Sequence, residues 1–506
     1  MRAVTPIRDE GIEMLSSQAV PTTAEANNRM RSSSPQVYDL YADLFSGAAG
    51  GESAGDSPGG WRGATPNQVA PAPSPRSPAT LADSGLTNGQ LCDLLLKTLY
   101  VQGVLQGVDL SRLLRLPFNL IDESLRMLRD QKLIEVASGE LVGRISYRFA
   151  LTEVGRLRAR DSFENCRYVG PAPVPIKQYV EHCRLQHVTG TPCNPSALRA
   201  AFKEFIIRTE MLEELGPAVC SGKSIFVYGP PGNGKTVIAK GLGQFLNMFG
   251  GEIYVPYAIL AENSIITVFD PGIHQTTDDA DLSQRGMATT STEQSSYMVH
   301  DGPVDLRWRR IKRPVVITGG ELTLDMLELQ YSKTANFYNA PLHIKANGGV
   351  FLIDDFGRQI VRPKDLLNRW IVPLEERVDY LTLTTGRKFM LPFEQLIIFS
   401  TNLDPKDLVD DAFLRRIKHK IRVDPPNREL YTIIFQMVCR QRDIPYNEAV
   451  VTALFHKYYE KGRTPRSSDP RDLLDMAQSI CRFHEQPVML TEELIDECAR
   501  RFFGEI

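Results

Sequence analysis

An apolar strand that runs into a glycine-rich loop constrains the fold of this chain more than any other segment. The sequence SIFVYGPPGNGKT occupies residues 224–236, and a helix-forming run follows from Val237 to Met248. The loop matches the G-x-x-x-x-G-K-[ST] motif at every fixed position and lies between the strand and the helix that this motif requires. The segment therefore predicts a phosphate-binding loop in an α/β fold.

Every residue of this loop is a candidate nucleotide contact. Glycines let backbone N–H groups turn toward phosphate oxygens, and the start of the following helix adds partial positive charge. We expect Lys235 to reach the β- and γ-phosphates and the Thr236 hydroxyl to bind Mg²⁺. The predicted nucleotide-binding residues are Gly229, Pro230, Pro231, Gly232, Asn233, Gly234, Lys235, Thr236 and Val237.

A second apolar run, Val350–Ile353, ends in two carboxylates, Asp354 and Asp355. Four consecutive apolar residues suit a strand that is buried on both faces of a parallel sheet. The two aspartates would then lie at the sheet edge where α/β proteins bind their ligands. We expect Asp354 to hold Mg²⁺ through water, and Asp355 to orient and deprotonate the attacking water.

Two later segments carry further candidate catalytic residues. A third apolar strand, residues 395–401, ends at Asn402, which we expect to hydrogen-bond the γ-phosphate or the attacking water. Residues 411–421 then carry Arg415 and Arg416 at a predicted helix end. Paired arginines in this position can reach the γ-phosphate of a neighbouring subunit as arginine fingers; the alternative is a surface helix with solvated cations.

Together these motifs resemble the AAA+ family of ATPases over about residues 200–506. In that family the glycine-rich loop is Walker A, the strand ending in two aspartates is Walker B, and the strand ending in asparagine is sensor 1. The resemblance implies that Arg415 and Arg416 lie on the arginine-finger helix. It also implies a C-terminal lid of four helices, in which Arg471 contacts the γ-phosphate as sensor 2, with Arg463 and Arg466 as nearby alternatives.

The sequence departs from the family pattern in two places. Family members usually carry glutamate after the Walker B aspartate, whereas Asp355 is one methylene shorter and predicts slower hydrolysis or a shifted geometry. The distance along the chain from Walker A to Walker B is also longer than the family core needs. The excess, about residues 269–339, contains three clustered acids, Asp278, Asp279 and Asp281.

This insert also contains a basic run, Arg307–Arg313, with the sequence RWRRIKR. Cations interleaved with tryptophan are typical of a contact with nucleic acid or an acidic partner. We favour instead an edge strand that is protected by charge. The segment Phe269–Gly272 is only a distant candidate for a pore loop, which weakens a prediction of polypeptide threading.

The composition changes along the chain predict five regions. Residues 1–85 are rich in proline, serine and glycine and read as a disordered arm, which contains one apolar island at Val37–Phe45. The other regions are a winged-helix-like domain (86–165), a linker (166–195), the AAA+ nucleotide-binding domain (196–425) and the helical lid (426–506). The predicted fold class is therefore α/β, a three-layer P-loop sheet with a helical lid and a winged-helix-like domain.

A winged helix can bind DNA through its third helix, here about residues 119–131. The charges of that helix balance: Asp122, Glu123 and Asp130 against Arg126 and Arg129. A helix without net positive charge gains little from phosphates. We therefore favour protein docking or a structural role over DNA contact.

Composition and charge indicate the cellular compartment and limit the classes of partner that we expect. The 506 residues carry a formal net charge of −3, so no polyelectrolyte partner is implied for the whole chain. Eight scattered cysteines without a C-x-x-C pair are typical of a reduced, cytoplasmic protein. No apolar run is long enough for a membrane span.

The leading hypothesis is a cytoplasmic AAA+ ATPase that hydrolyses ATP with Mg²⁺ between the subunits of a ring and remodels a protein client. We expect a homo-oligomer, specifically a hexamer. The chain looks most like uncharacterised bacterial AAA+ ATPases described as having chaperone activity. The alternatives are a DNA-associated loader or regulator, and a nucleotide-dependent scaffold with weak hydrolysis, which Asp355 would permit.

Overall fold

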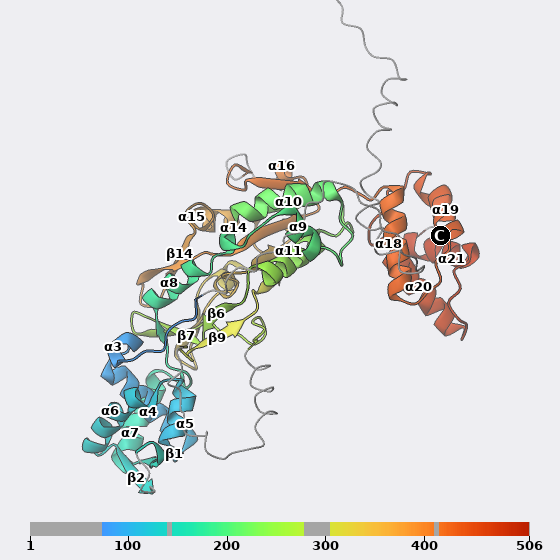
Figure 1. Ribbon diagram of the computed structural model, residues 1–506. Coiled ribbons are helices and arrows are strands. Elements are labelled where there is room, and N and C mark those ends of the chain that lie inside the picture. The colour runs from blue at the N-terminus through green and yellow to red at the C-terminus, as the bar shows by residue number, and fades with distance from the viewer. Residues whose placement is uncertain (1–72, 139–143, 278–303, 409–413, 505–506) are drawn as a thin grey trace, which may run out of the picture. The chain divides into compact units, whose positions relative to one another are not determined.

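The computed structural model describes residues 73–138, 144–277, 304–408 and 414–504 (Figure 1). Most of the predicted arm, its apolar island and the three clustered acids of the insert lie outside the described residues. The same holds for residues 409–413, just before the paired arginines.

A five-stranded parallel sheet forms the centre of the predicted nucleotide-binding domain, in the order β10–β13–β16–β5–β17. Its strands are β5 (Ile225–Tyr228), β10 (Val315–Thr318), β13 (Val350–Ile353), β16 (Leu396–Thr401) and β17 (His419–Arg422). The strand that precedes the phosphate loop, β5, and the strand that ends in carboxylates, β13, are thus separated by β16. This order differs from both common doubly wound orders, in which the early strands are direct neighbours.

Alternate residues of these strands supply two cores. Ile225, Val227 and Ile398 pack with α9 (Pro195–Ala201), α10 (Thr209–Ser221) and α11 (Lys235–Phe249). Phe226, Phe351 and Phe399 point to the other face, against α14 (Pro363–Arg369) and Trp370, which precedes α15 (Ile371–Glu376). Because successive strand residues face opposite sides, both faces are buried and the domain has three layers (Figure 1).

The region before the phosphate loop differs from the sequence-based expectation. From the sequence alone, residues 196–215 favour one helix that leads into the phosphate-loop strand, whereas α9 and α10 are separated by residues 202–208. Within this break Ile206 packs against the core of the C-terminal helices, while Ile207 belongs to the core of the central sheet. A continuous helix would place neighbouring residues only 100° apart and could not serve both cores as this extended segment does.

A second sheet, in the order β11–β12–β8–β7–β4, contains two short strands of the insert, β11 and β12. Its strands are β4 (Val174–Pro175), β7 (Ala258–Ala261), β8 (Ser264–Thr267), β11 (Gln330–Ser332) and β12 (Phe337–Asn339). The segment 166–195, which we expected as a linker, contains β4 and α8 (Ile176–Leu185). Tyr179 and Cys183 of α8 are buried against this sheet.

The N-terminal domain contains three successive helices and a small antiparallel sheet; its classification as winged-helix-like stays a prediction. The helices are α4 (Asn88–Gln102), α5 (Gly107–Leu114) and α6 (Phe118–Asp130), with α7 (Glu153–Asn165) packed on α4. The strands β1 (Leu105–Gln106), β2 (Ile134–Ser138) and β3 (Arg148–Leu151) pair in the order β1–β3–β2. Its core continues into the second sheet through Ala258.

The basic run of the insert includes an edge strand, but its outermost cations are not exposed. β9 (Trp308–Ile311) pairs with β6 (Ile253–Pro256) in a two-stranded sheet. Arg307, only 1% exposed, forms an ion pair with Asp305, with Nη2 2.8 Å from Oδ2. Arg313 is also buried and donates to backbone carbonyl groups, including that of Gly348 at 2.6 Å. These two cations hold the fold together, so they are unavailable to nucleic acid.

The distant pore-loop candidate, Phe269–Gly272, is tied to the domain. Lys345 Nζ lies 2.8 Å from Asp270 Oδ2, and the ring of His274 stacks on Phe269. His274 Nε2 in turn lies 2.8 Å from the Lys345 carbonyl oxygen. A turn fixed at both ends in this way does not resemble a projecting threading loop.

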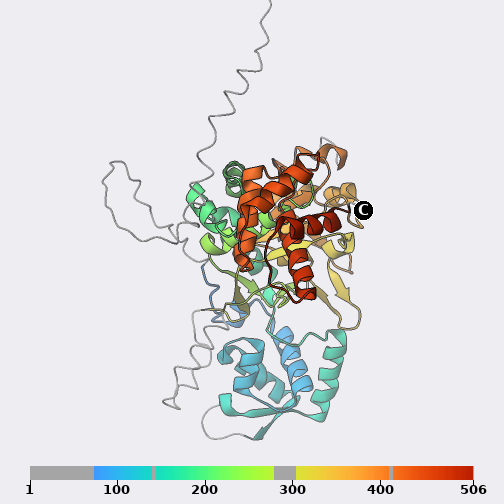
Figure 2. The same cartoon turned by 90° about the vertical axis from the view of Figure 1, so that its right-hand side faces the viewer.

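Four helices in residues 428–503 form the predicted lid (Figures 1 and 2). They are α18 (Arg428–Gln441), α19 (Glu448–Leu454) with a π-helical extension (Phe455–Tyr459), α20 (Asp469–Phe483) and α21 (Glu492–Phe503). Their apolar faces share one core. The predicted α/β fold class, a three-layer domain with a parallel sheet followed by a bundle of four helices, is confirmed. None of the helices that the structure describes is long and apolar enough to cross a bilayer.

Candidate nucleotide site

The predicted site residues converge at the carboxyl edge of the central sheet. Neighbouring strands end in register, since Tyr228 lies opposite Thr401, and Ile353 opposite Phe399. The residues that follow these strand ends are therefore close in space. Three hydrogen bonds join them: Lys235 Nζ to Asn402 Oδ1 (2.6 Å), Thr236 Oγ1 to Asp354 Oδ2 (2.7 Å), and Asn402 Nδ2 to Asp355 Oδ1 (3.0 Å).

The glycines of the phosphate loop are required by its geometry. Gly229 has φ 141°, and a Cβ atom there would lie 2.2 Å from the Val423 carbonyl oxygen of the chain leaving β17. Gly234 has φ 85° and precedes α11 as its N-cap. Only glycine adopts these conformations without strain, so the loop can pass close to β17 and turn directly into the helix.

The first turn of α11 offers backbone donors to an anion. No side chain caps this helix in the described structure, whereas Thr87 caps α4, Thr152 caps α7 and Asn427 caps α18. Uncapped N–H groups and the helix dipole together favour a phosphate at this point. The loop around them is thus built for a polyanion.

Lys235 is held inside the loop by carbonyl groups. Its ammonium group donates to the carbonyl oxygens of Gly229 (2.9 Å) and Pro230 (3.0 Å) as well as to Asn402. Burial lowers the pKa of Lys235, and the nearby carboxylates of Asp354 and Asp355 partly offset this effect. A buried cation that has only neutral direct partners is well placed to gain a phosphate oxygen.

Thr236 and Asp354 fit a magnesium ion. Asp354 is anchored through its backbone N–H, which donates to the Thr318 carbonyl oxygen at 2.7 Å. Its Oδ2 accepts from Thr236, and its Oδ1 accepts from the Asp355 backbone N–H at 3.1 Å. A hydroxyl and a carboxylate at hydrogen-bond distance are hard oxygen donors, which Mg²⁺ prefers alongside phosphate and water.

Asp355 adopts a left-handed backbone conformation with φ 50°. The next residue is fixed to β16, because the Phe356 N–H donates to the Ser400 carbonyl at 2.6 Å and the Thr401 hydroxyl donates to the Phe356 carbonyl at 2.7 Å. The chain therefore turns sharply after the strand, and the exposed Asp355 carboxylate meets Asn402. Strained backbone of this kind is concentrated at functional sites.

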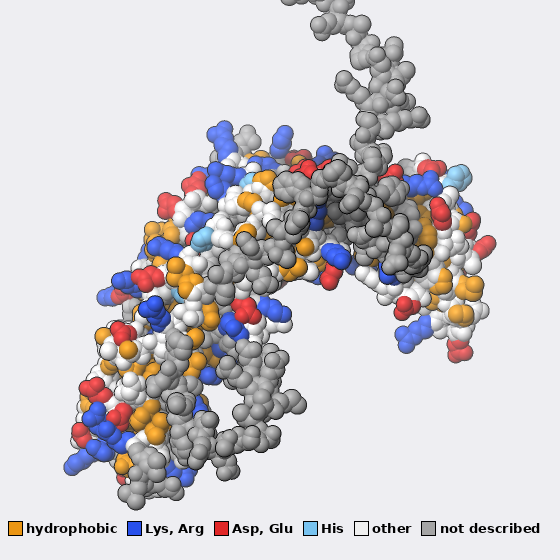
Figure 3. Space-filling view, in the orientation of Figure 1, with side chains coloured by type: hydrophobic (Ala, Val, Ile, Leu, Met, Phe, Trp, Pro, Cys, Tyr) orange, Lys and Arg blue, Asp and Glu red, His pale blue; other side chains and the backbone are white. Residues whose placement is uncertain are grey.

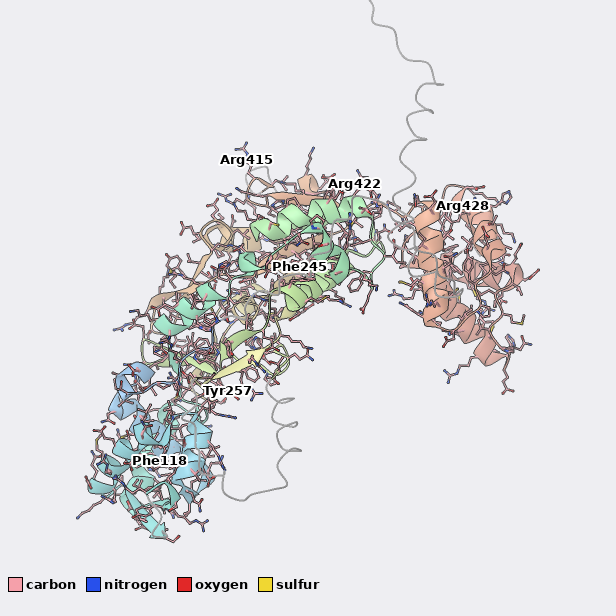
Figure 4. All side chains as sticks on the ribbon, in the orientation of Figure 1. Phe118, Phe245, Tyr257, Arg415, Arg422 and Arg428 are labelled. Atoms are coloured by element: carbon pink, nitrogen blue, oxygen red, sulfur yellow. The ribbon has the colours of Figure 1, made fainter. Side chains whose placement is uncertain are left out.

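The structure separates the two candidate finger arginines. Arg416 Nε lies 2.7 Å from Glu375 Oε1, so this guanidinium is paired within its own chain. The Arg415 side chain is exposed and points away from the domain in Figure 4. Among the described residues neither arginine is in contact with Lys235 or the aspartates of the site. Their finger role stays a prediction.

Of the three lid arginines considered, a different one lies at the phosphate loop. Arg471 Nη2 lies 3.3 Å from its neighbour Asp472 Oδ1, and the side chain is largely exposed. Arg463 stacks on the Phe503 ring at 3.6 Å. The Cδ atom of Arg466 lies 3.4 Å from the point that a Gly232 Cβ would occupy. From the sequence, Arg466 is only an alternative to Arg471.

A lid turn, Arg466–Ser468, also hydrogen-bonds the phosphate loop through its backbone. The Ser467 N–H donates to Asn233 Oδ1 at 3.1 Å, and the Ser468 N–H donates to the Gly232 carbonyl oxygen at 2.9 Å. No sequence motif predicts these bonds, because their donors are backbone groups more than 200 residues from their acceptors. Figure 4 labels Arg422 and Arg428, which flank the connection from β17 to the lid.

The buried carboxyl group of Asp469 fixes the lid turn through hydrogen bonds. Asp469 Oδ2 accepts from the Arg466 N–H at 3.0 Å and from the Tyr459 hydroxyl at 2.9 Å. The Tyr459 hydroxyl also lies 3.0 Å from that of Tyr431. Burial raises the pKa of Asp469, so ionisation of this carboxyl group in the folded lid is disfavoured.

Comparison with known proteins gives a family match in the lid and several similar solved structures. A sequence family described as a domain of unknown function (DUF8689) matches residues 427–501. No curated protein matches the chain significantly. The chain resembles NtrX from Brucella abortus in complex with ADP at 12% identity and a TM-score of 0.33. That match covers 67% of this chain and 58% of NtrX, so the chain spans less than two thirds of NtrX.

Two Thermotoga maritima structures are similar at the same level. Domain III of the replication initiation protein DnaA shares 14% identity with a TM-score of 0.31, over 62% of this chain and 99% of that domain. The RuvB Holliday junction branch migration motor shares 13% identity with a TM-score of 0.32, over 59% of this chain and 70% of RuvB. The description of the fold therefore rests on the sheet order and the phosphate loop of this chain.

Proposed function

We propose that this protein is a Mg²⁺-dependent ATPase of the AAA+ type. One observation carries the proposal: Lys235, Asn402 and Asp355 form a continuous hydrogen-bonded chain beside the Thr236–Asp354 pair. A cation for phosphate, an oxygen set for Mg²⁺ and a carboxylate for water thus lie at one sheet edge. These are the parts that phosphoryl transfer to water requires.

Each residue then has a distinct role. Thr236 and Asp354 would hold Mg²⁺, which neutralises charge on the β- and γ-phosphates when bound. Lys235 would exchange its carbonyl partners for phosphate oxygens, and the uncapped start of α11 would add backbone donors. Asp355 would accept a proton from the attacking water, with Asn402 orienting the water or the γ-phosphate.

A complete site would need a second chain. Arg415 is exposed at the end of the domain and fits an arginine finger that acts on the next subunit, whereas Arg416 is paired with Glu375. We therefore propose a homo-oligomeric ring, a hexamer, and remodelling of a protein client recruited by the N-terminal domain. Arg471 or Arg466 would supply the lid cation.

The DNA-associated alternative is less well supported. Two cations of the basic run are buried, and on the third helix of the N-terminal domain Asp122 pairs with Arg126, Nε to Oδ2 3.6 Å. On the face shown in Figure 3, acidic and basic side chains of the N-terminal domain are interspersed. A surface of mixed sign does not favour binding to a phosphate backbone.

Phosphate release from Mg-ATP by the purified full-length chain tests the proposal, with Lys235→Ala as the control. We expect Mg²⁺-dependent turnover that the substitution abolishes, with no change when duplex or single-stranded DNA is added. Turnover equal to that of Lys235→Ala, with nucleotide still bound by the wild type, would identify a nucleotide-dependent scaffold instead. A salt-sensitive stimulation by DNA would favour the DNA-associated alternative.

A further inference from the structure

Outside the nucleotide site, two cysteines meet beside a cavity between α9 and α10. The cavity has a volume of about 450 Å³ and is lined by apolar side chains that include Leu198 and Leu212. Cys193 lies two residues before α9, and Cys220 lies in the last turn of α10. Both line this cavity, which a small apolar molecule can enter.

The two cysteines lie close together. Cys220 Sγ lies 3.7 Å from the Cys193 carbonyl oxygen. Cys193 Sγ in turn lies 3.7 Å from the Gly216 carbonyl oxygen of α10. Both cysteines are reduced in this structure. A disulfide between them would place their Cβ atoms about 4 Å apart.

We propose that Cys193 and Cys220 form a reversible disulfide when the protein encounters an organic hydroperoxide. Cys220 attacks the peroxide as a thiolate and becomes a sulfenic acid, and the peroxide O–O bond breaks to release an alcohol. Cys193 then attacks the Cys220 sulfur, an S–S bond forms, and the sulfenic oxygen leaves as water. A dithiol reductant returns both residues to thiols.

The surroundings of the two residues assign these roles. Cys220 is exposed, whereas Cys193 is partly covered. Burial, together with the neighbouring Cys220, raises the pKa of Cys193 to about 12. The partly covered Cys193 is therefore a poorer first nucleophile than the exposed Cys220.

The disulfide would link the two ends of a segment that contacts both the central sheet and the lid. Residues 193–220 contain α9, the break at 202–208 and α10, which leads directly into β5. In this break Ile206 packs on the lid core, and Arg208 Nη2 lies 3.8 Å from Asp424 Oδ2 in the connection to the lid. A disulfide that joins both ends would limit how far this segment can follow the lid.

Peptide mapping of the full-length chain tests the proposal. The reduced protein is treated with tert-butyl hydroperoxide, alkylated and digested, and the peptides are identified by mass spectrometry. We expect a linked pair containing Cys193 and Cys220, which dithiothreitol removes, and a loss of two alkylatable thiols. This readout does not depend on ATP hydrolysis, so it remains valid if the proposed activity is wrong.

Two variants sharpen the result. Cys193→Ser should lose the linked peptide and leave Cys220 as a sulfenic acid that dimedone captures. Cys92→Ser, a partly exposed cysteine on α4, is the matched control and should keep the link. If Cys220 is instead over-oxidised or joined to another chain while Cys193 stays alkylatable in the folded wild type, the proposal is overturned. The same conclusion follows if peroxide leaves both thiols alkylatable.

Discussion

The carboxyl edge of the central sheet and the lid turn both meet the phosphate loop, but with different chemical groups. At the sheet edge, side chains make the contact: Asn402 accepts from Lys235, and Asp354 accepts from Thr236. At the lid turn, backbone N–H groups donate to the loop. Carboxylates and ammonium groups can bind metal and phosphate, whereas neutral backbone bonds can only fix position. We infer that the edge performs chemistry and that the turn couples the lid to it.

The largest expected effect tests whether the residues at the sheet edge suffice for hydrolysis or need an arginine from a neighbouring subunit. Arg415→Ala should lower turnover by roughly 10³-fold or more while ATP affinity changes little, because an arginine finger stabilises charge only in the transition state. Arg416→Ala is the neighbouring control and should have a smaller effect, since Arg416 pairs with the exposed Glu375. Steady-state phosphate release and nucleotide titration measure both.

Mixed assemblies give the corresponding test of a shared site. Arg415→Ala chains combined with Lys235→Ala chains should recover part of the activity, because some sites then receive an intact loop and an intact finger. If well-assembled mixtures show no recovery, Arg415 does not act on a neighbour.

The next effect concerns the edge itself. Asp355→Asn should reduce hydrolysis by about 10²- to 10⁴-fold and leave ATP binding intact, because the amide keeps the shape of the carboxylate but cannot accept the proton. Asp355→Glu is the matched variant. It introduces the residue usual in AAA+ ATPases, and a higher turnover than wild type would show that the shorter side chain limits the rate.

The third prediction addresses the lid turn. Asn233→Ala removes the acceptor of the Ser467 N–H and should increase opening of the lid turn by about 2- to 10-fold in hydrogen exchange, as expected for one hydrogen bond. Ser467→Ala is the control, because the contact uses the backbone and should survive it. Equal hydrogen-exchange rates in wild type and Asn233→Ala would show that this hydrogen bond does not couple the lid to the phosphate loop.

The smallest effect is on lid stability. Burial raises the pKa of Asp469, so the folded lid binds this proton more tightly than the unfolded chain. The resulting stabilisation is fully present below the unfolded pKa and is lost as pH rises through the folded pKa. Asp469→Asn should therefore raise the unfolding temperature by a few degrees at pH 7, with the advantage shrinking toward pH 4. An unchanged difference across this pH range would contradict the assignment.

The sequence predicts the sheet edge well because each of its residues follows a buried strand or begins a helix. Asp354 and Asn402 could be placed in this way, since parallel strands bring their carboxyl ends together. The orientation of Asp355 could not be predicted, because its φ of 50° depends on hydrogen bonds from Phe356 and Thr401.

In the lid and the insert, the sequence does not predict where individual arginine side chains lie. The helix periodicity of the lid predicts its four helices, but not that Arg466, rather than Arg471, lies against Gly232. In the insert, a run of cations suggests exposure, yet Arg313 is buried because carbonyl groups from distant loops surround it. Such partners are brought together only by the tertiary fold, so the local pattern contains no signal for them.

Arg307 has a practical consequence for dissecting this protein. Its Nη1 donates to the carbonyl oxygens of Ser84 (2.8 Å) and Pro173 (3.2 Å), so one buried guanidinium joins the beginning of the N-terminal domain to the insert. A fragment starting at residue 196 would remove both acceptors and uncover a guanidinium that the full chain buries. An expression fragment that keeps these contacts should therefore begin before Ser84.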